Sequence, residues 1–103
     1  MVGEEYKSGL QSIDVEKVTE LFKALTEPRR ILILKELRKG EHCICDLVKI
    51  LGLSQPAVSH HISLLSRAGL IKTRKEGRKV ICSLRDEKNI DQLLQIAEKL
   101  IKS

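Results

Sequence analysis

The chain has 103 residues, of which 42% are hydrophobic, 32% charged and only 2% aromatic. This length and composition fit one globular domain with an aliphatic core and exclude a disordered chain. No apolar run approaches the ~20 residues of a membrane-spanning helix, and the first residues lack the apolar core of a signal peptide. We therefore expect a cytoplasmic protein with no membrane partner. The odd number of cysteines, three, argues against a secreted disulfide framework.

The net charge of +5 is concentrated in one segment. Between residues 54 and 85 there are seven basic residues and a single acid, Glu76, whereas the rest of the chain is close to neutral. A solvated basic face is one explanation. Confinement of the whole excess to one segment favours instead a polyanionic partner such as nucleic acid.

The first two predicted elements are helices. Residues 1–12 show no periodicity and are expected to form a flexible tail, so residues 13–103 make up the single domain. Asp14 is a suitable N-cap for a helix that ends near Glu27, because proline disfavours helical geometry in the residue before it. Pro28 then opens the second helix, which runs to Gly40.

Two further helices are joined by a short turn. Apolar residues at helical spacing predict a third helix over 44–51, closed by Gly52, and a fourth that is capped by Ser54 and ended by Gly69. The inward stripe of the fourth helix is Val58, Ile62 and Leu65. Two helices joined in this way are typical of a helix-turn-helix.

The periodicity changes after Gly69. Residues 70–75 and 78–84 are β-prone runs on either side of Glu76-Gly77, which predicts a hairpin. A hairpin directly after a recognition helix is a wing. A last amphipathic helix covers residues 90–102, and in a chain this small we expect it to pair with a second copy of itself, together with the first helix, in a homodimer.

Three stretches together resemble the ArsR/SmtB family of metal-responsive repressors over residues 14–100. They are LFKALTEPRRILILKEL, the CICDL run, and LSQPAVSHHISLLSRAGLIKTRKEGRKVICSL. The resemblance implies a mostly α, dimeric winged helix-turn-helix protein with five helices and a two-stranded wing. It also implies a repressor, not an enzyme, that binds DNA without a cofactor and leaves its operator when an inducer metal or metalloid binds.

The chain departs from the sensor patterns of this family. The arsenic-type motif has a third cysteine three residues beyond the second, where this chain has Val48. The cadmium-type site adds N-terminal cysteines, yet residues 1–42 contain none. The zinc-type site on the last helix needs histidine, which is absent from residues 86–103. A sensor of the CxC kind is therefore implied without its usual third ligand.

Residues at the start of a recognition helix face base edges, while the wing holds phosphates. The exposed candidates in the fourth helix and its cap are Ser54, Gln55, Ala57, Ser59, His60 and His61. Glutamine can pair with adenine, and alanine can touch a thymine methyl. Adjacent histidines point about 100° apart on a helix, so a metal shared by the histidine pair is not expected. In a two-fold dimer, two such helices lie roughly 34 Å apart and address a palindromic double-stranded operator.

The wing bases Arg74, Lys75, Arg78 and Lys79 straddle the hairpin tip and are expected to reach the DNA backbone or minor groove. The alternative is a hairpin tip that is only solvated. The clustering of basic residues there makes this the weaker interpretation.

Cys43 and Cys45 are the candidate metal ligands. Residues two apart on a regular helix point about 200° apart, so joint coordination requires an irregular first turn. Soft thiolates there would suit As(III), Sb(III), Cd(II), Pb(II) or Zn(II), with His42 or Asp46 as helpers for a divalent metal. Packing is the alternative, since free cysteine often behaves as a small hydrophobe. For Cys82, on the wing, packing is the favoured role.

Two other functions remain open from the sequence. In one, the chain binds DNA but uses Cys43 and Cys45 as a thiol-redox switch, or gives them no sensory role. In the other, more remote, it is a metal carrier or thiol oxidoreductase, which would be expected to carry a CxxC near a βαβ unit and no basic wing.

Overall fold

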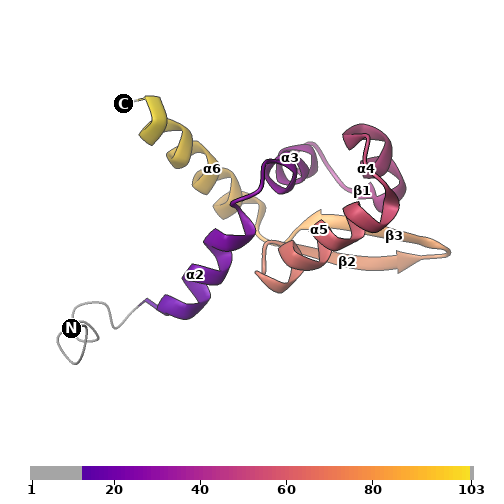
Figure 1. Cartoon of the computed structure of the whole chain (residues 1–103), viewed down its shortest axis with the longest axis horizontal. Coiled ribbons are helices and arrows are strands. Elements are labelled where there is room, and N and C mark those ends of the chain that lie inside the picture. Colours follow the sequence, from indigo (N-terminus) through magenta and orange to yellow (C-terminus); the bar gives the residue numbers. More distant parts are fainter. Residues whose placement is uncertain (1–12, 103) are drawn as a thin grey trace.

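The computed structural model describes residues 13–102, so the predicted tail over 1–12 lies outside the described residues. Five helices and three short strands follow one another along this part of the chain (Figure 1). They are α2 (Val15–Ala24), α3 (Pro28–Leu37), β1 (His42–Cys43), α4 (Ile44–Leu51), α5 (Gln55–Arg67), β2 (Ile71–Glu76), β3 (Lys79–Leu84) and α6 (Glu87–Lys102). The predicted helices and wing are confirmed.

The helix starts follow the predicted caps. The Asp14 side chain accepts a hydrogen bond of 3.1 Å from the Lys17 N–H and begins α2. α2 ends at Ala24, three residues before the predicted end near Glu27, and the Glu27 side chain instead caps α3, whose first residue is Pro28. Proline fits there because the first N–H of a helix has no intrahelical partner.

The core is aliphatic, as the composition predicts. Its largest fully buried side chains come from α3, α4, α5 and the two wing strands. They are Ile33, Leu34, Leu47, Val58, Leu65, Ile71 and Cys82. α3 and α4 each pack on α5, and each of the three helices contacts a wing strand, which fixes the helix-turn-helix relative to the wing.

The sheet contains one strand more than the sequence predicts. β1 pairs antiparallel with β3, His42 opposite Cys82 and Cys43 opposite Ile81, so the strand order is β1-β3-β2. The predicted hairpin is present, and its strands pair from Ile71 opposite Leu84 to Glu76 opposite Lys79. Glu76 therefore belongs to β2, and the turn lies at Gly77-Arg78, one residue after the predicted Glu76-Gly77. The added strand ties the segment that carries the two close cysteines to the wing by backbone hydrogen bonds.

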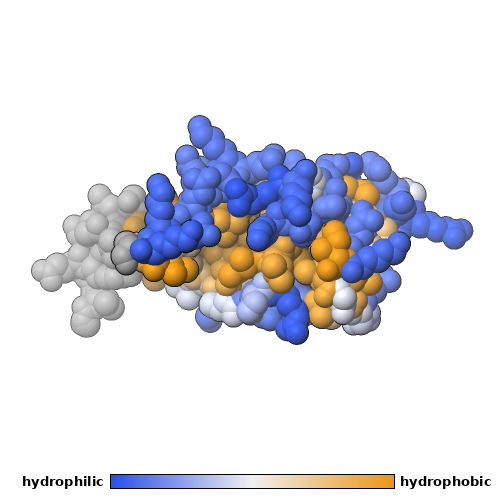
Figure 2. Space-filling view, turned by 90° about the horizontal axis from the view of Figure 1, so that it is seen from above, coloured by the Kyte–Doolittle hydropathy of each residue, from blue (hydrophilic) through white to orange (hydrophobic). Residues whose placement is uncertain are grey.

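α2 and α6 extend away from the wing tip (Figure 1). Both helices leave apolar side chains in solvent. Their exposed apolar residues are Val15, Val18 and Phe22 on α2 and Ile96, Leu100 and Ile101 on α6, joined by Ile31 and Leu32 on α3. Phe22 is 53% exposed and Ile101 82% exposed. Figure 2 shows exposed apolar side chains gathered in a band bordered by polar ones.

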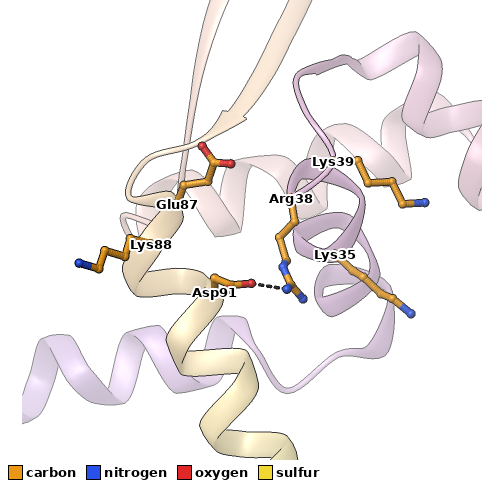
Figure 3. A pocket seen from close by; sticks show the side chains of 6 residues that line it. All are labelled: Lys35, Arg38, Lys39, Glu87, Lys88 and Asp91. Carbon is orange, nitrogen blue, oxygen red and sulfur yellow. Dashed lines mark ion pairs between the residues drawn. The ribbon is translucent and has the colours of Figure 1, made fainter.

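One ion pair links α3 to α6. Arg38 pairs with Asp91 beside a shallow depression between the two helices (Figure 3). The ammonium groups of Lys35, Lys39 and Lys88 point away from that depression, so they do not converge on a common ligand position. None of the helices within residues 13–102 is both long and apolar enough to cross a lipid bilayer.

Cys82 provides a test of the core. Burial raises the pKa of its thiol from the usual 9.0 to about 11. The unfolded chain releases this proton at lower pH than the folded one, so the free energy of unfolding should fall as the pH rises from about 9 to about 11, by roughly 2–3 kcal/mol. Urea unfolding of the wild type and of Cys82→Ala across this range measures the effect. The variant should be less stable but less steeply pH-dependent, and equal slopes would contradict the burial of a protonated thiol.

Candidate DNA-binding face and thiol site

The turn between α4 and α5 has the geometry of a helix-turn-helix. Gly52 ends α4 with a φ of +66°, a left-handed conformation that glycine adopts without steric cost. The Ser54 hydroxyl then accepts a hydrogen bond of 3.3 Å from the Ala57 N–H and begins α5. Gly52 thus ends α4 and Ser54 begins α5, as the sequence predicts. The start of α5 lies at the same end of the molecule as the wing tip (Figure 1).

The outer face of α5 carries most of the predicted DNA-contacting residues. Val58, Ile62 and Leu65 point into the core, as predicted. Ser54, Gln55 and His60 are exposed, and Ala57 and Ser59 are half-buried.

His61 does not lie on that exposed face, and its predicted exposure is wrong. Its side chain is only 13% exposed and faces the start of α3. Its Nδ1 lies 3.2 Å from an Arg30 guanidinium nitrogen, and its Nε2 lies 3.9 Å from the Glu27 carboxylate. Burial lowers the pKa of His61, against the opposing effect of the Glu27 carboxylate. The His61 ring centroid lies 6.1 Å from that of His60. Through Arg30 and Glu27, His61 holds α5 against the start of α3.

The four basic residues at the wing tip differ in their surroundings. Arg74 donates hydrogen bonds of 2.7 and 3.0 Å to the two carboxylate oxygens of Glu41 and of 2.8 and 3.0 Å to Glu76. The Arg74 hydrogen bond lowers the pKa of Glu41, and the same contacts raise the pKa of Arg74. Lys75, Arg78 and Lys79 are exposed and form no ion pair within the described residues. The sequence did not indicate that Arg74 is held by carboxylates.

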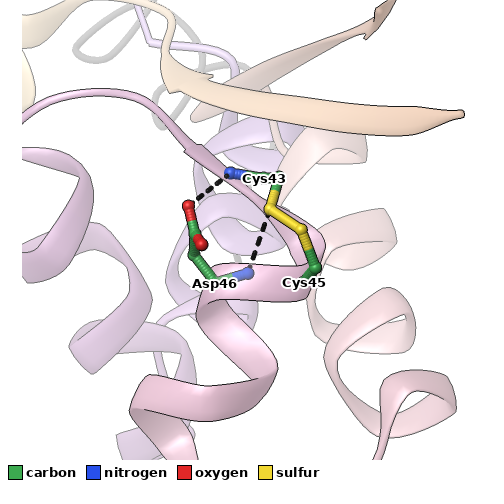
Figure 4. Close-up of side chains that lie close together, drawn as sticks. All are labelled: Cys43, Cys45 and Asp46. Atoms are coloured by element: carbon green, nitrogen blue, oxygen red, sulfur yellow. Dashed lines mark hydrogen bonds between the residues drawn. A yellow bond between two sulfur atoms is a disulfide. The ribbon is translucent and has the colours of Figure 1, made fainter. Parts of the chain in front are cut away.

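Cys43 and Cys45 lie at the junction of β1 and α4. The first turn of α4 is regular, but Cys43 precedes it, so the angular separation of two residues within a helix does not apply to this pair. Cys43 is the N-cap, with an extended backbone (φ −75°, ψ 161°), and Cys45 is the second residue of the helix. Their Cα atoms are 5.1 Å apart and their sulfurs form a disulfide (Figure 4). Cys43 is buried and Cys45 exposed.

Asp46 completes this junction. Its N–H donates a hydrogen bond of 3.1 Å to the Cys43 sulfur, and its carboxylate accepts one of 3.4 Å from the Cys43 N–H, which is a capping box with sulfur in place of a hydroxyl (Figure 4). One ligand atom from each of Cys43, Cys45 and Asp46 lies within 4.8 Å of the others. The His42 Nδ1 lies 3.6 Å from an Asp46 carboxylate oxygen. In the reduced state this donor set fits a soft or borderline metal ion.

Two other residues lie outside the cluster of Cys43, Cys45 and Asp46, here called the thiol cluster. Val48, at the position of the third arsenic-type cysteine, packs against the core. Cys82 is fully buried in the middle of β3 with a free thiol, which agrees with its predicted packing role.

The packed helix pair, the exposed start of α5 and the basic hairpin define a winged helix-turn-helix DNA-binding protein. The sequence profile described as "bacterial regulatory protein, arsR family" matches residues 27–73. A transcriptional repressor SmtB homolog from Synechocystis is 34% identical over 95 residues, which cover 91% of this chain and 72% of the relative. The chain belongs to the ArsR/SmtB family of transcriptional repressors, and its relatives are regulators rather than enzymes.

Two more comparisons add a second relative and a solved structure. A cadmium resistance transcriptional regulatory protein CadC homolog from Staphylococcus aureus is 42% identical over 81 residues, covering 78% of this chain and 66% of the relative. The homodimeric winged helix-turn-helix domain Mb0332 from Mycobacterium bovis superimposes with a TM-score of 0.76 at 24% identity, over 96% of this chain and 91% of that one. The likeness to Mb0332 supports the fold.

The sulfur cap can be tested by stability. In reduced protein, Cys43→Ser keeps an acceptor for the Asp46 N–H, whereas Cys43→Ala removes it. We expect the alanine variant to be less stable than the serine variant by about 1 kcal/mol. Urea unfolding with a reductant present measures the difference. The matched pair Cys45→Ser and Cys45→Ala, at an exposed position that caps nothing, should lack this preference for serine. A Cys43→Ala variant as stable as Cys43→Ser would refute the cap.

Proposed function

We propose that this repressor releases its operator when a thiophilic metal or metalloid binds Cys43 and Cys45. The observation that carries the proposal is the position of the thiol pair, which ends β1 and begins α4. β1 is hydrogen-bonded to the wing, and α4 packs on the recognition helix. A change at the pair therefore reaches both DNA-contacting elements directly.

In the proposed complex, α5 reads bases and the wing holds the backbone. Ser54, Gln55, Ala57, Ser59 and His60 present their side chains toward base edges or nearby phosphates. His61 contacts Arg30 and Glu27 and so holds the recognition helix α5 against α3. Lys75, Arg78 and Lys79 are free to meet phosphates, whereas Arg74 would first have to leave Glu41 and Glu76.

The proposed operator is palindromic because the proposed active form is a two-fold dimer. The apolar side chains exposed on α2 and α6 are those that a second copy would cover. Both helices lie away from the wing, so dimerisation through them leaves both recognition helices free (Figure 1). A symmetric pair of recognition helices spaced about one DNA turn apart matches two half-sites roughly 34 Å apart.

The donor set favours a divalent metal over As(III). Two thiols leave As(III) one sulfur short of three, because Val48 occupies the usual third position. A divalent ion such as Cd(II), Zn(II) or Pb(II) accepts mixed sulfur, nitrogen and oxygen donors. The Asp46 carboxylate lies beside the two sulfurs, and the His42 ring lies next to Asp46. The similarity to a cadmium resistance regulatory protein supports a divalent metal as the inducer. Reduced thiols are needed, which fits a cytoplasmic protein.

A modest coupling energy is enough for such a switch. A hundredfold loss of DNA affinity corresponds to about 2.7 kcal/mol, within the usual range for allosteric coupling. That amount is comparable to the loss of a helix cap together with one or two hydrogen bonds.

The disulfide supports a second candidate, a thiol-redox switch at the same pair. Oxidation joins the two sulfurs and removes both as metal ligands. In this alternative, an oxidant alone would change DNA affinity and metal would not.

DNA binding should be strongly salt-dependent. Replacing Arg78 and Lys79 with alanine should weaken binding to all duplexes alike and flatten the plot of log affinity against log salt, by about one unit for each phosphate that the variant no longer neutralises. Replacing Gln55 with alanine should instead change sequence preference. Fluorescence anisotropy with operator and random duplexes separates the two effects. If the double variant keeps its affinity for random duplex, the wing does not hold the backbone.

The sensor is tested on reduced protein bound to duplex from upstream of its own gene. Cys43→Ser and Cys45→Ser should bind this DNA like the wild type but should no longer release it when Cd(II) or arsenite is added. Cys82→Ala is the control and should release normally, because Cys82 lies in the core.

A parallel titration with an oxidant in metal-free buffer separates the two candidates. Release by oxidant alone, and not by metal, would support the redox switch. If both serine variants release DNA with metal as readily as the wild type, the sensor lies elsewhere.

A further inference from the structure

A groove lined with hydroxyl groups runs between the recognition helix and the wing. Its lining residues include Ser59, Ser63, Ser66 and Arg67 from α5 and Thr73 and Val80 from the two wing strands. Ser63, Ser66 and Arg67 lie in the second half of α5, beyond the residues that the sequence singled out for DNA contact.

The serines form one stripe on the helix. Ser59, Ser63 and Ser66 are spaced i, i+4 and i+7, so they share a face that looks toward the wing. At 1.5 Å per residue the stripe is about 10 Å long. The hydroxyls of these serines and of Thr73 make no hydrogen bond within residues 13–102, so they are available to a ligand.

The charge around the groove is positive. Arg67 lies at one end, and no carboxylate lines the groove among the described residues. Thr73, Lys75 and Val80 share one face of the hairpin, because Lys75 stands opposite Val80 and alternates with Arg74 along β2. The acids nearest the wing, Glu41 and Glu76, are held by Arg74, which points to the opposite face.

We infer that this groove holds the sugar-phosphate backbone of one operator strand. Serine and threonine hydroxyls and arginine are common donors to DNA phosphates, and such contacts set register without reading sequence. A stripe of about 10 Å is long enough to meet more than one phosphate of a strand that runs along it. Ser59, at the start of the stripe, places this strand next to the bases that Gln55 would read. The inference rests on the proposed DNA binding and extends it to Ser63, Ser66, Arg67 and Thr73.

The test uses neutral and charged variants that should behave differently. Ser63→Ala/Ser66→Ala removes two uncharged donors and should lower affinity for random duplex about tenfold or more without changing the salt slope. Arg67→Ala removes a charge and should flatten the slope by about one unit. The matched controls are Ser83→Ala, on the other face of the hairpin, and Lys88→Ala on α6, and both should bind like the wild type.

Loss of folding does not confound this test. Alanine has a higher helix propensity than serine, so Ser63→Ala/Ser66→Ala should melt at or above the temperature of the wild type while binding DNA more weakly. If the wild type binds duplex but the groove variants match the two controls, the groove inference is overturned and the proposed function stands. If the wild type binds no duplex at any salt concentration, both fail.

Saturable binding of inorganic phosphate at Arg67, with DNA affinity unaffected by the serine changes, would also overturn the inference. That result would assign the groove to a free anion.

Discussion

Residue 43 must end a strand and cap a helix at the same time, and the arrangement of the DNA-contacting elements depends on this. Its backbone extends β1 along β3, opposite Ile81, while its sulfur accepts the Asp46 N–H at the start of α4. The strand fixes the distance of the helix-turn-helix from the wing, and the cap fixes the direction in which α4 leaves the sheet. Serine would meet both demands as well, but it lacks the sulfur on which the proposed metal site depends.

The local features of the fold were predictable from sequence because they depend on near neighbours. Asp14, Pro28, Gly52 and Ser54 each begin or end a helix through contacts within a few residues. The missed features join distant parts of the chain. β1 is only two residues long and has no strand signal of its own, since its partner lies about 40 residues further on. Likewise, the Arg74–Glu41 pair spans 33 residues.

The candidate site was predictable to a similar extent. The thiol pair, the exposed start of α5 and the wing bases all follow from residue type and spacing. The inward position of His61 could also have been found, because it lies three residues after Val58 and four before Leu65, at the edge of the buried stripe. The hydroxyl stripe of α5 was readable at the same spacing, but its relation to the wing required the tertiary structure.

The clustered donor atoms come from Cys43, Cys45 and Asp46, with His42 next to Asp46, and of these four residues only Cys43 is buried. Under the proposed function, exchange of the side chain at 42 or 45 would change the donor set while leaving the capping box, the core and α5 in place. The inducer of the proposed switch could then change by single codon substitutions. The proposed operator contacts belong to a separate set of residues on α5 and the wing, so they could change independently.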